Sequence, residues 1–305
     1  MGTLSEKDLP GLWRDADSAS LSGQRWTLRY ARGRLYGSVG ASMGGVLSLQ
    51  TSRVDVAAAI VAAGFLVALI SEVLSLIHRP ERVWYSGRAL AESAKTLAWR
   101  YAVAANPFPP GMSTKDAQSL LRQRLEQAIR ATSSDITITS VGVALTEGMN
   151  DLRRAPFADR RTAYIADRTL KQYEWYVDQA KRNNRCALVW HSALVVAEIV
   201  ALTLALLRVF GPWDINLAGV LATVIGAGAA WVAIKQYSRL ASMYSMAAGE
   251  LALQVEGLHC IDLSAWPSAV ADAEDAISRE HTIWLAARTG ALPLKSSGAG
   301  NVVTA

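Results

Sequence analysis

Cysteine is scarce in this 305-residue sequence, and its two cysteines, Cys186 and Cys260, lie far apart along the chain. They form neither a disulfide framework nor the paired ligand spacing of a zinc site, so we expect no metal ion and a reduced, cytoplasm-facing protein. The first thirty residues also lack the uninterrupted apolar core of a secretory signal. We therefore expect later apolar segments to direct insertion into a membrane.

Signatures of nucleotide and nucleic-acid binding are missing as well. The run GASMGG has glycines but lacks the Lys and the Ser or Thr of a phosphate-binding loop. The net charge of +5 comes from arginines clustered beside apolar segments, which fits an anionic lipid surface better than nucleic acid. We expect no cofactor, no catalytic residues and no nucleic-acid partner.

Apolar residues, which make up 51% of the chain, are gathered into long charge-poor runs. The strongest is VAAAIVAAGFLVALISEVLSLI, residues 56–77, with about a dozen Val, Ile, Leu and Phe that each favour insertion by roughly 0.3 to 0.6 kcal/mol. Its one carboxylate, Glu72, is off centre and can lean toward the interface or be protonated. The sum predicts a membrane span.

Three further runs complete the pattern, at residues 36–50, 186–207 and 217–234. Short loops join them into two helical hairpins. The first hairpin has a small-residue helix followed by a bulky one, and the second has the reverse order. Small residues at four-residue spacing let helices approach closely, and we expect this of the following residues: Gly40, Gly44, Ala222, Gly226 and Ala230.

Basic residues flank the hairpins on the side of the termini and of the middle segment, and they are nearly absent from the loops within each hairpin. By the positive-inside rule, both termini and the middle segment face the cytoplasm. The alternating stretch DITITSV, 135–141, predicts one minor strand element. The expected fold is therefore an all-α membrane protein with two transmembrane hairpins, four spans and cytoplasmic helical extensions.

Three polar residues within the spans invite a functional interpretation. Glu198 is central in its span, and His191 lies seven residues earlier on the same helix face, whereas Glu72 is nearer an end. A carboxylate in a bilayer is costly unless it faces water or a partner, so these residues either line an ion pathway or are protonated or hydrogen-bonded to a facing helix.

Aromatic and charged residues are combined outside the spans in WYSGRALAESAKTLAWRYAVAANPF, 84–108, and in the pair YEWYVDQAKRNNR with ISREHTIWLAART. These stretches resemble motifs of SLATT domains, which are two-span membrane proteins associated with bacterial nucleotide-sensing systems. The resemblance divides the chain into an N-terminal segment 1–19, a first unit 20–150, a second unit 158–290 and a disordered tail 291–305. The residues that carry the motifs are Trp84, Tyr85, Glu92, Trp99, Arg100, Tyr101, Arg279, Glu280, His281 and Trp284.

Each motif residue has a structural reading beside the functional one. Trp84 and Tyr85 suit an aromatic belt at the membrane surface, and Trp99 and Tyr101 suit core packing better than a platform for a nucleotide base. Glu280 and His281 are adjacent, so they point about 100° apart on a helix and cooperate poorly on one substrate. Packing near the membrane is favoured over catalysis there.

The resemblance implies an oligomeric, pore-forming effector of the bacterial inner membrane in an antiviral defence system, triggered by a separate nucleotide-signalling protein. No enzymatic site is attributed to such domains. The alternative is a non-conducting membrane scaffold or sensor that recruits a cytoplasmic partner. An intramembrane enzyme is least favoured, because His191 and Glu198 lie about 10 Å apart along the helix axis.

Overall fold

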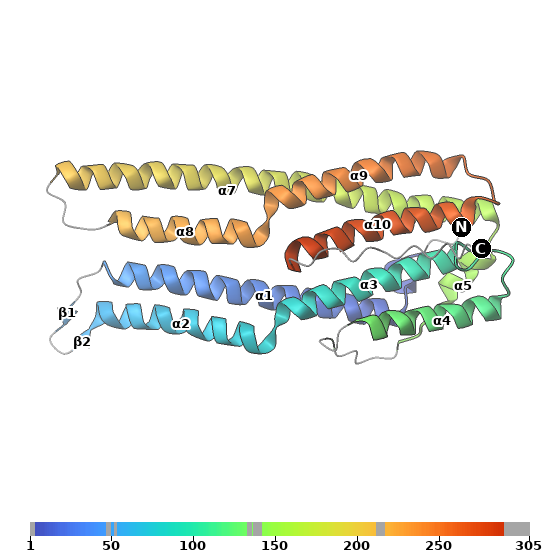
Figure 1. The fold of residues 1–305 in the computed structure, drawn as a ribbon, viewed down its shortest axis with the longest axis horizontal. Coiled ribbons are helices and arrows are strands. Elements are labelled where there is room, and N and C mark those ends of the chain that lie inside the picture. Colours follow the sequence, from blue (N-terminus) through green and yellow to red (C-terminus); the bar gives the residue numbers. More distant parts are fainter. Residues whose placement is uncertain are drawn as a thin grey trace, which may run out of the picture.

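The computed structural model describes residues 4–46, 50–51, 54–132, 136, 142–211 and 217–289, with backbone alone for residues 50, 51, 54 and 279–289. The molecule is a long rod (Figure 1). One part, here called the apolar half, consists of α2 (Val56–His78), α8 (Leu217–Lys235) and the distal ends of α1 (Gly11–Gly44) and α7 (Lys171–Phe210). The remainder is the polar half.

Two long helices run through both halves. α1 is a single helix of 34 residues, and α7 continues α6 (Phe157–Ala163) and the π-helical segment η2 (Tyr164–Leu170) without interruption. Together α6, η2 and α7 form one helix of 54 residues, Phe157–Phe210. The third apolar run is therefore the continuation of a helix that begins in the polar half.

The returning helices break where they leave the apolar half. Arg79, with φ of 44°, separates α2 from α3 (Pro80–Ala102), and Gln236, with φ of 52°, separates α8 from α9 (Tyr237–His259). Left-handed backbone is unfavourable for residues with a side chain, so a helix ends at such a residue. Pro80 begins α3, since its fixed φ suits a first helical position. A long helix, a returning span, a one-residue break and a further helix thus occur twice.

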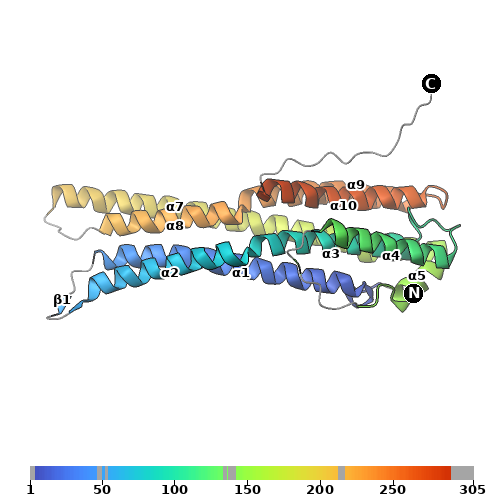
Figure 2. The same ribbon diagram turned by 60° about the horizontal axis from the view of Figure 1, so that its bottom comes forward.

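In the apolar half, four helices lie side by side in the order α2, α1, α8, α7 (Figures 1 and 2). Close approach of α1 and α2 requires glycine: a Cβ on Gly37 would lie 2.6 Å from the backbone oxygen of Gly64. α1 meets α8 through a hydrogen bond of 3.0 Å between the hydroxyl groups of Ser42 and Thr223. The helices form an open row.

Among the described residues, three helices are long and apolar enough to cross a membrane, namely α2, the helix that ends in α7, and the helix that begins with α8. α1 is not among these three, so three of the four predicted spans are supported and the fourth is not confirmed. Its charge-free end, from Leu35 to Gly44, covers only about 15 Å at 1.5 Å per residue, and arginines precede it. Almost nothing of the most apolar stretch of each of the three is buried in the chain.

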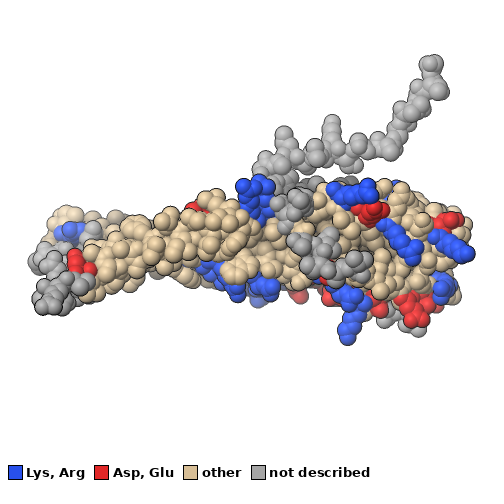
Figure 3. All heavy atoms as spheres, turned by 90° about the horizontal axis from the view of Figure 1, so that it is seen from below, with Lys and Arg blue, Asp and Glu red and all other residues tan. Residues whose placement is uncertain are grey.

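Charge follows the division of the rod. Figure 3 shows Lys and Arg side chains at the junction of the two halves and over the polar half, while the visible face of the apolar half consists almost wholly of other residues. Large apolar side chains point outward there, among them Phe65, Leu188 and Phe210, which are 62%, 69% and 85% exposed. This distribution suggests a lipid environment for one half and water for the other.

The polar half is a helical bundle with its own core. α3, α4 (Thr114–Ala131), α5 (Glu147–Arg154), α9 and α10 (Trp266–Thr289) pack with the proximal parts of α1 and α7 (Figure 1). Edge-to-face aromatic pairs join its layers, with Tyr164 between Trp99 and Trp266. The indole N–H of Trp266 also donates to the carbonyl of Val103 at 2.9 Å.

Strand structure is minimal. β1 (Gln50–Thr51) and β2 (Val54–Asp55) pair antiparallel at the tip of the first hairpin, with Gln50 opposite Asp55. Asp55 then caps α2, since its carboxylate accepts a hydrogen bond of 3.0 Å from the amide of Ala58. Of the strand expected at 135–141 only Ile136 is described, so that prediction lies outside the described residues.

The contact between α1 and α2 can be tested with a matched pair of alanine substitutions. We expect Gly37→Ala to destabilise the protein by about 1 to 3 kcal/mol, because the added methyl group has no space. Gly40→Ala, three residues along the same helix, meets no described atom within 4 Å and should leave stability unchanged or raise it slightly. Thermal unfolding in detergent measures both. Equal melting temperatures for the two variants would contradict the close contact.

Candidate functional site

Polar groups in the apolar half fall into two sets, and the first lies between α1 and α2. Arg34 donates to the carboxylate of Glu72 at 2.5 Å, with both side chains about half exposed. One turn away, the hydroxyl of Tyr30 lies 2.8 Å from Nδ1 of His78. Of the two readings of Glu72, a partner on the facing helix is what the structure shows. These two contacts join α1 and α2 at the end of the hairpin next to the polar half.

The second set lies on α7 and has no such partner. Glu198 and His191 are both exposed in the chain, and neither has a hydrogen-bond or ion-pair partner among the described residues. The inner face of α7 is formed instead by Trp190 and Leu194, which pack against Gly228 of α8. The single chain therefore turns the carboxylate of Glu198 outward, at the centre of the apolar part of α7.

The small residues expected to pack helices divide in the same way. Gly44 packs against the first turn of α2, where a Cβ would lie 3.1 Å from the carbonyl oxygen of Ala57. A Cβ added to Gly40 or to Gly226, in contrast, would have no described atom within 4 Å. Ala222 and Ala230 are exposed, so the small-residue row of α8 faces away from the chain's own helices.

The motif residues on α3 serve the polar half. Trp84 is 7% exposed and packs on α1, where its carbonyl accepts a hydrogen bond from Ser20; it stacks on Tyr85 at 5.2 Å. The aromatic belt expected at Trp84 is thus corrected, because this indole is buried between two helices. Trp99 and Tyr101, at 3% and 0% exposure, lie in the core as expected.

The charged motif residues form ion pairs. Arg88 and Glu92 pair at 2.9 Å, one turn apart on α3. Arg100 bonds to Asp275 at 2.6 Å and to the carbonyl of Ala271, which ties α3 to α10. The side chains of Arg279, Glu280, His281 and Trp284 lie outside the described residues, although their backbone belongs to α10.

A buried charge cluster that sequence patterns did not reveal joins three helices. Glu274 of α10 is 0% exposed and accepts four hydrogen bonds: two from Arg168, at 2.8 and 2.7 Å, one from Tyr164 at 3.1 Å and one from Thr96 at 2.9 Å. One signal exists in the sequence, since Glu274 falls on the apolar face of α10 with Val270. Its partner Arg168 lies too far away in sequence to be identified.

The electrostatics of this cluster favour a fixed charge pair. Burial alone would lower the pKa of Arg168, but the carboxylate of Glu274 raises it above its ordinary value. Burial and the same carboxylate raise the pKa of Tyr164 well above its usual range. The arginine stays charged and the phenol stays neutral, so the cluster locks helices together. Within the described ranges, no three His, Cys, Asp or Glu side chains gather as metal ligands would.

Loss of the buried carboxylate should destabilise the polar half strongly. We expect Glu274→Gln to lower the free energy of unfolding by about 3 kcal/mol or more, because it leaves the Arg168 charge buried without a counter-ion. The matched control is Glu126→Gln, whose partner Arg130 is 77% exposed, and it should change stability by less than about 1 kcal/mol. Chemical unfolding followed by circular dichroism compares them. A similar small effect for both would show that the cluster is not a lock.

Comparison with protein families gives two matches in tandem. Residues 10–161 match the model described as SMODS and SLOG-associating 2TM effector domain 3, and residues 164–284 match the model described as SMODS and SLOG-associating 2TM effector domain 1. No curated protein and no solved structure matches the chain. The two matches meet at the junction of α6 and η2, inside the continuous helix.

Proposed function

Since the chain belongs to the SLATT family, as two tandem domains of a membrane effector in a defence system, we propose that its copies assemble into a pore in the bacterial inner membrane. The observation that carries this proposal is Glu198, which is exposed, has no partner among the described residues, and lies at the centre of the apolar part of α7. A charge at that depth in lipid costs roughly 2.5 to 3.5 kcal/mol or more. A water-filled lumen between copies removes the cost.

The arrangement of the helices supports assembly rather than conduction through one chain. An open row of four helices encloses no lumen, since α2 and α7 stand at opposite ends of the row (Figure 1). A further copy can approach α8 closely, because the outward row of Ala222, Gly226 and Ala230 presents little side-chain bulk. The polar residues Glu198 and His191 of α7 and the small-residue face of α8 are thus both available to other copies.

We propose that α1 forms the fourth crossing despite its arginines. Gly44 at its end contacts Ala57, the second residue of α2, so α1 reaches as far across the apolar half as α2 does. α2 and α8 cover it on two sides. Arg34 then lies near the inner edge of the hydrocarbon, neutralised by Glu72. With basic residues at the junction of the halves, both termini and the whole polar half face the cytoplasm.

The trigger is a separate protein in this proposal. The matching family descriptions name association with SMODS and SLOG, which supports an external signalling partner. The polar half, which joins the two tandem units around one core, is the part of the chain that such a partner can reach.

Ion flux through purified protein in liposomes tests the pore. We expect the wild-type chain to release a trapped cation, and Glu198→Gln to reduce the flux severalfold, because the isosteric amide removes the lumen charge while keeping the packing. Glu256→Gln, an exposed carboxylate of α9 outside the apolar half, is the matched control and should conduct normally.

Two outcomes contradict the pore. One is a chain that inserts into liposomes without any flux, with and without lysate from cells carrying the activated defence system. The other is toxicity in cells that survives Glu198→Ala but is abolished by changes at Arg100 or Trp284, which would favour a non-conducting scaffold that recruits a cytoplasmic partner.

A further inference from the structure

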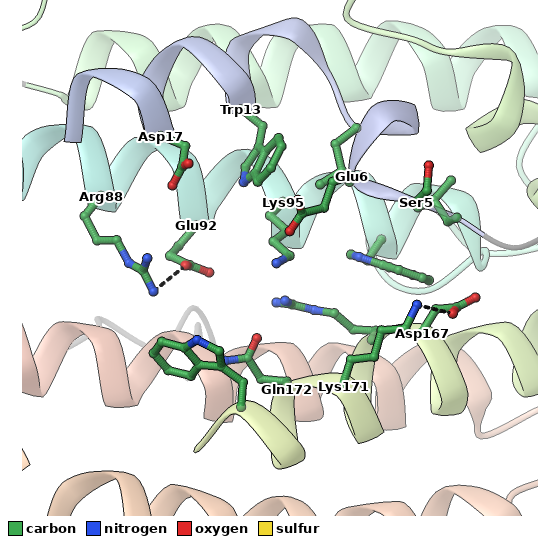
Figure 4. A pocket seen from close by; sticks show the side chains of 15 residues that line it. Ser5, Glu6, Trp13, Asp17, Arg88, Glu92, Lys95, Asp167, Lys171 and Gln172 are labelled. Atoms are coloured by element: carbon green, nitrogen blue, oxygen red, sulfur yellow. Dashed lines mark hydrogen bonds and ion pairs between the residues drawn. The ribbon is translucent and has the colours of Figure 1, made fainter. Parts of the chain in front are cut away.

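We propose that the polar half binds a small soluble organic anion in a cavity between α1, α3 and α7, with the anionic group held by Lys95 and Arg168. The cavity has a volume of about 470 Å³, within the roughly 300 to 1,000 Å³ of ligand pockets and far larger than one phosphate ion needs. Figure 4 shows Lys95 reaching into it from α3, with Trp13 above and Lys171 and Gln172 below.

The first donor is a buried nitrogen of Arg168. The side chain is 1% exposed, and its Nε and one terminal nitrogen are both taken by Glu274. The other terminal nitrogen, Nη1, is buried and has no partner among the described residues, although Arg168 lines the cavity. Leaving such a donor unpaired costs about 1 to 3 kcal/mol. A ligand oxygen in the cavity would satisfy it.

The second donor is Lys95. Among the described residues it has no carboxylate within ion-pair distance, and its ammonium lies 5.9 Å from the centre of the Trp13 ring. Burial lowers the pKa of Lys95, and the charge of Arg168 lowers it further, whereas the carboxylates of Glu92 and Glu6 raise it. Lys95 and Arg168 both line the cavity, so an anionic group bound there can interact with both cations. The other cavity cations are already paired, Arg88 with Glu92 and Lys171 with Asp167.

The remaining lining defines the body of the ligand. Trp13, Trp99 and Trp175 line the cavity with indole rings, which suit a planar or apolar group attached to the anion. Carboxylates of Glu6 and Asp17 are also present, and burial raises the pKa of Asp17. They disfavour a highly charged polyanion and can accept hydrogen bonds from ligand N–H or O–H groups. The site fits one phosphate or carboxylate on a ring.

A dissolved molecule fits better than a lipid headgroup. Lys95 is sixteen residues beyond Arg79, where α2 ends, which places it about 24 Å along α3 from the apolar half at 1.5 Å per residue. The polar headgroup layer of a bilayer adds only about 5 to 8 Å on each side of its hydrocarbon core.

The position of the cavity gives binding a structural consequence. Trp13 and Lys95 belong to the first family match, and Arg168 and Lys171 belong to the second. A bound anion therefore bridges the two units near the N-terminal ends of α1 and α7, the helices that continue into the apolar half. Binding itself does not depend on pore formation, so its test is independent of ion flux.

Calorimetric titration of the full chain in detergent with phenyl phosphate tests the site. We expect saturable binding and a raised melting temperature, with weaker binding of inorganic phosphate. Lys95→Met should reduce the affinity at least tenfold, whereas Lys115→Met, an exposed lysine of α4, should not change it. Gln172→Trp, which fills the cavity while keeping its charges, should also block binding, and it serves where Lys95→Met does not fold.

Three results would overturn the proposal. The first is the absence of saturable binding of phenyl phosphate to the folded chain. The second is unchanged affinity in a folded Lys95→Met or Gln172→Trp variant. The third is binding of a short-chain phosphatidic acid but not of phenyl phosphate, which would make the site a lipid contact.

Discussion

The outward apolar surface of α2, α7 and α8 constrains everything else in this protein. Soluble proteins rarely expose a contiguous apolar patch of more than a few hundred Å², and here whole helices have almost no buried part in their most apolar stretches. A lipid bilayer covers such a surface and removes the cost of exposing it to water. Once the apolar half lies in a bilayer, its backbone must be helical. The charged residues must then lie outside the apolar half, and Figure 3 shows them at the junction of the two halves and over the polar half.

The reversed order of small and bulky helices in the two hairpins matches the open row. The small-residue helices α1 and α8 occupy the middle of the row, and the bulky α2 and α7 stand at its ends. The chain buries its glycine contacts internally, with Gly37 against Gly64, and turns its bulkiest side chains toward lipid. The same order leaves Glu198 on an end helix, available to another copy.

The sequence predicted those features that depend on local composition. Long apolar runs identified α2, α8 and the apolar part of α7. It did not predict which glycines of α1 contact α2, because only the facing helix distinguishes Gly37 and Gly44, which pack, from Gly40, which does not. The helix breaks at Arg79 and Gln236 could not be predicted from the sequence, since neither residue is a glycine. Arg168 and Glu274 meet only in three dimensions.

The depth of α7 in the membrane tests the central claim most directly. In a chain with Cys186 and Cys260 replaced by serine, single cysteines are introduced at Val196 and Thr203, on the side of α7 away from Glu198, and at Lys181 in the polar half. The account predicts that a membrane-impermeant maleimide labels Lys181→Cys in inside-out vesicles but reaches Val196→Cys and Thr203→Cys only after detergent is added. Equal labelling of all three without detergent would contradict it.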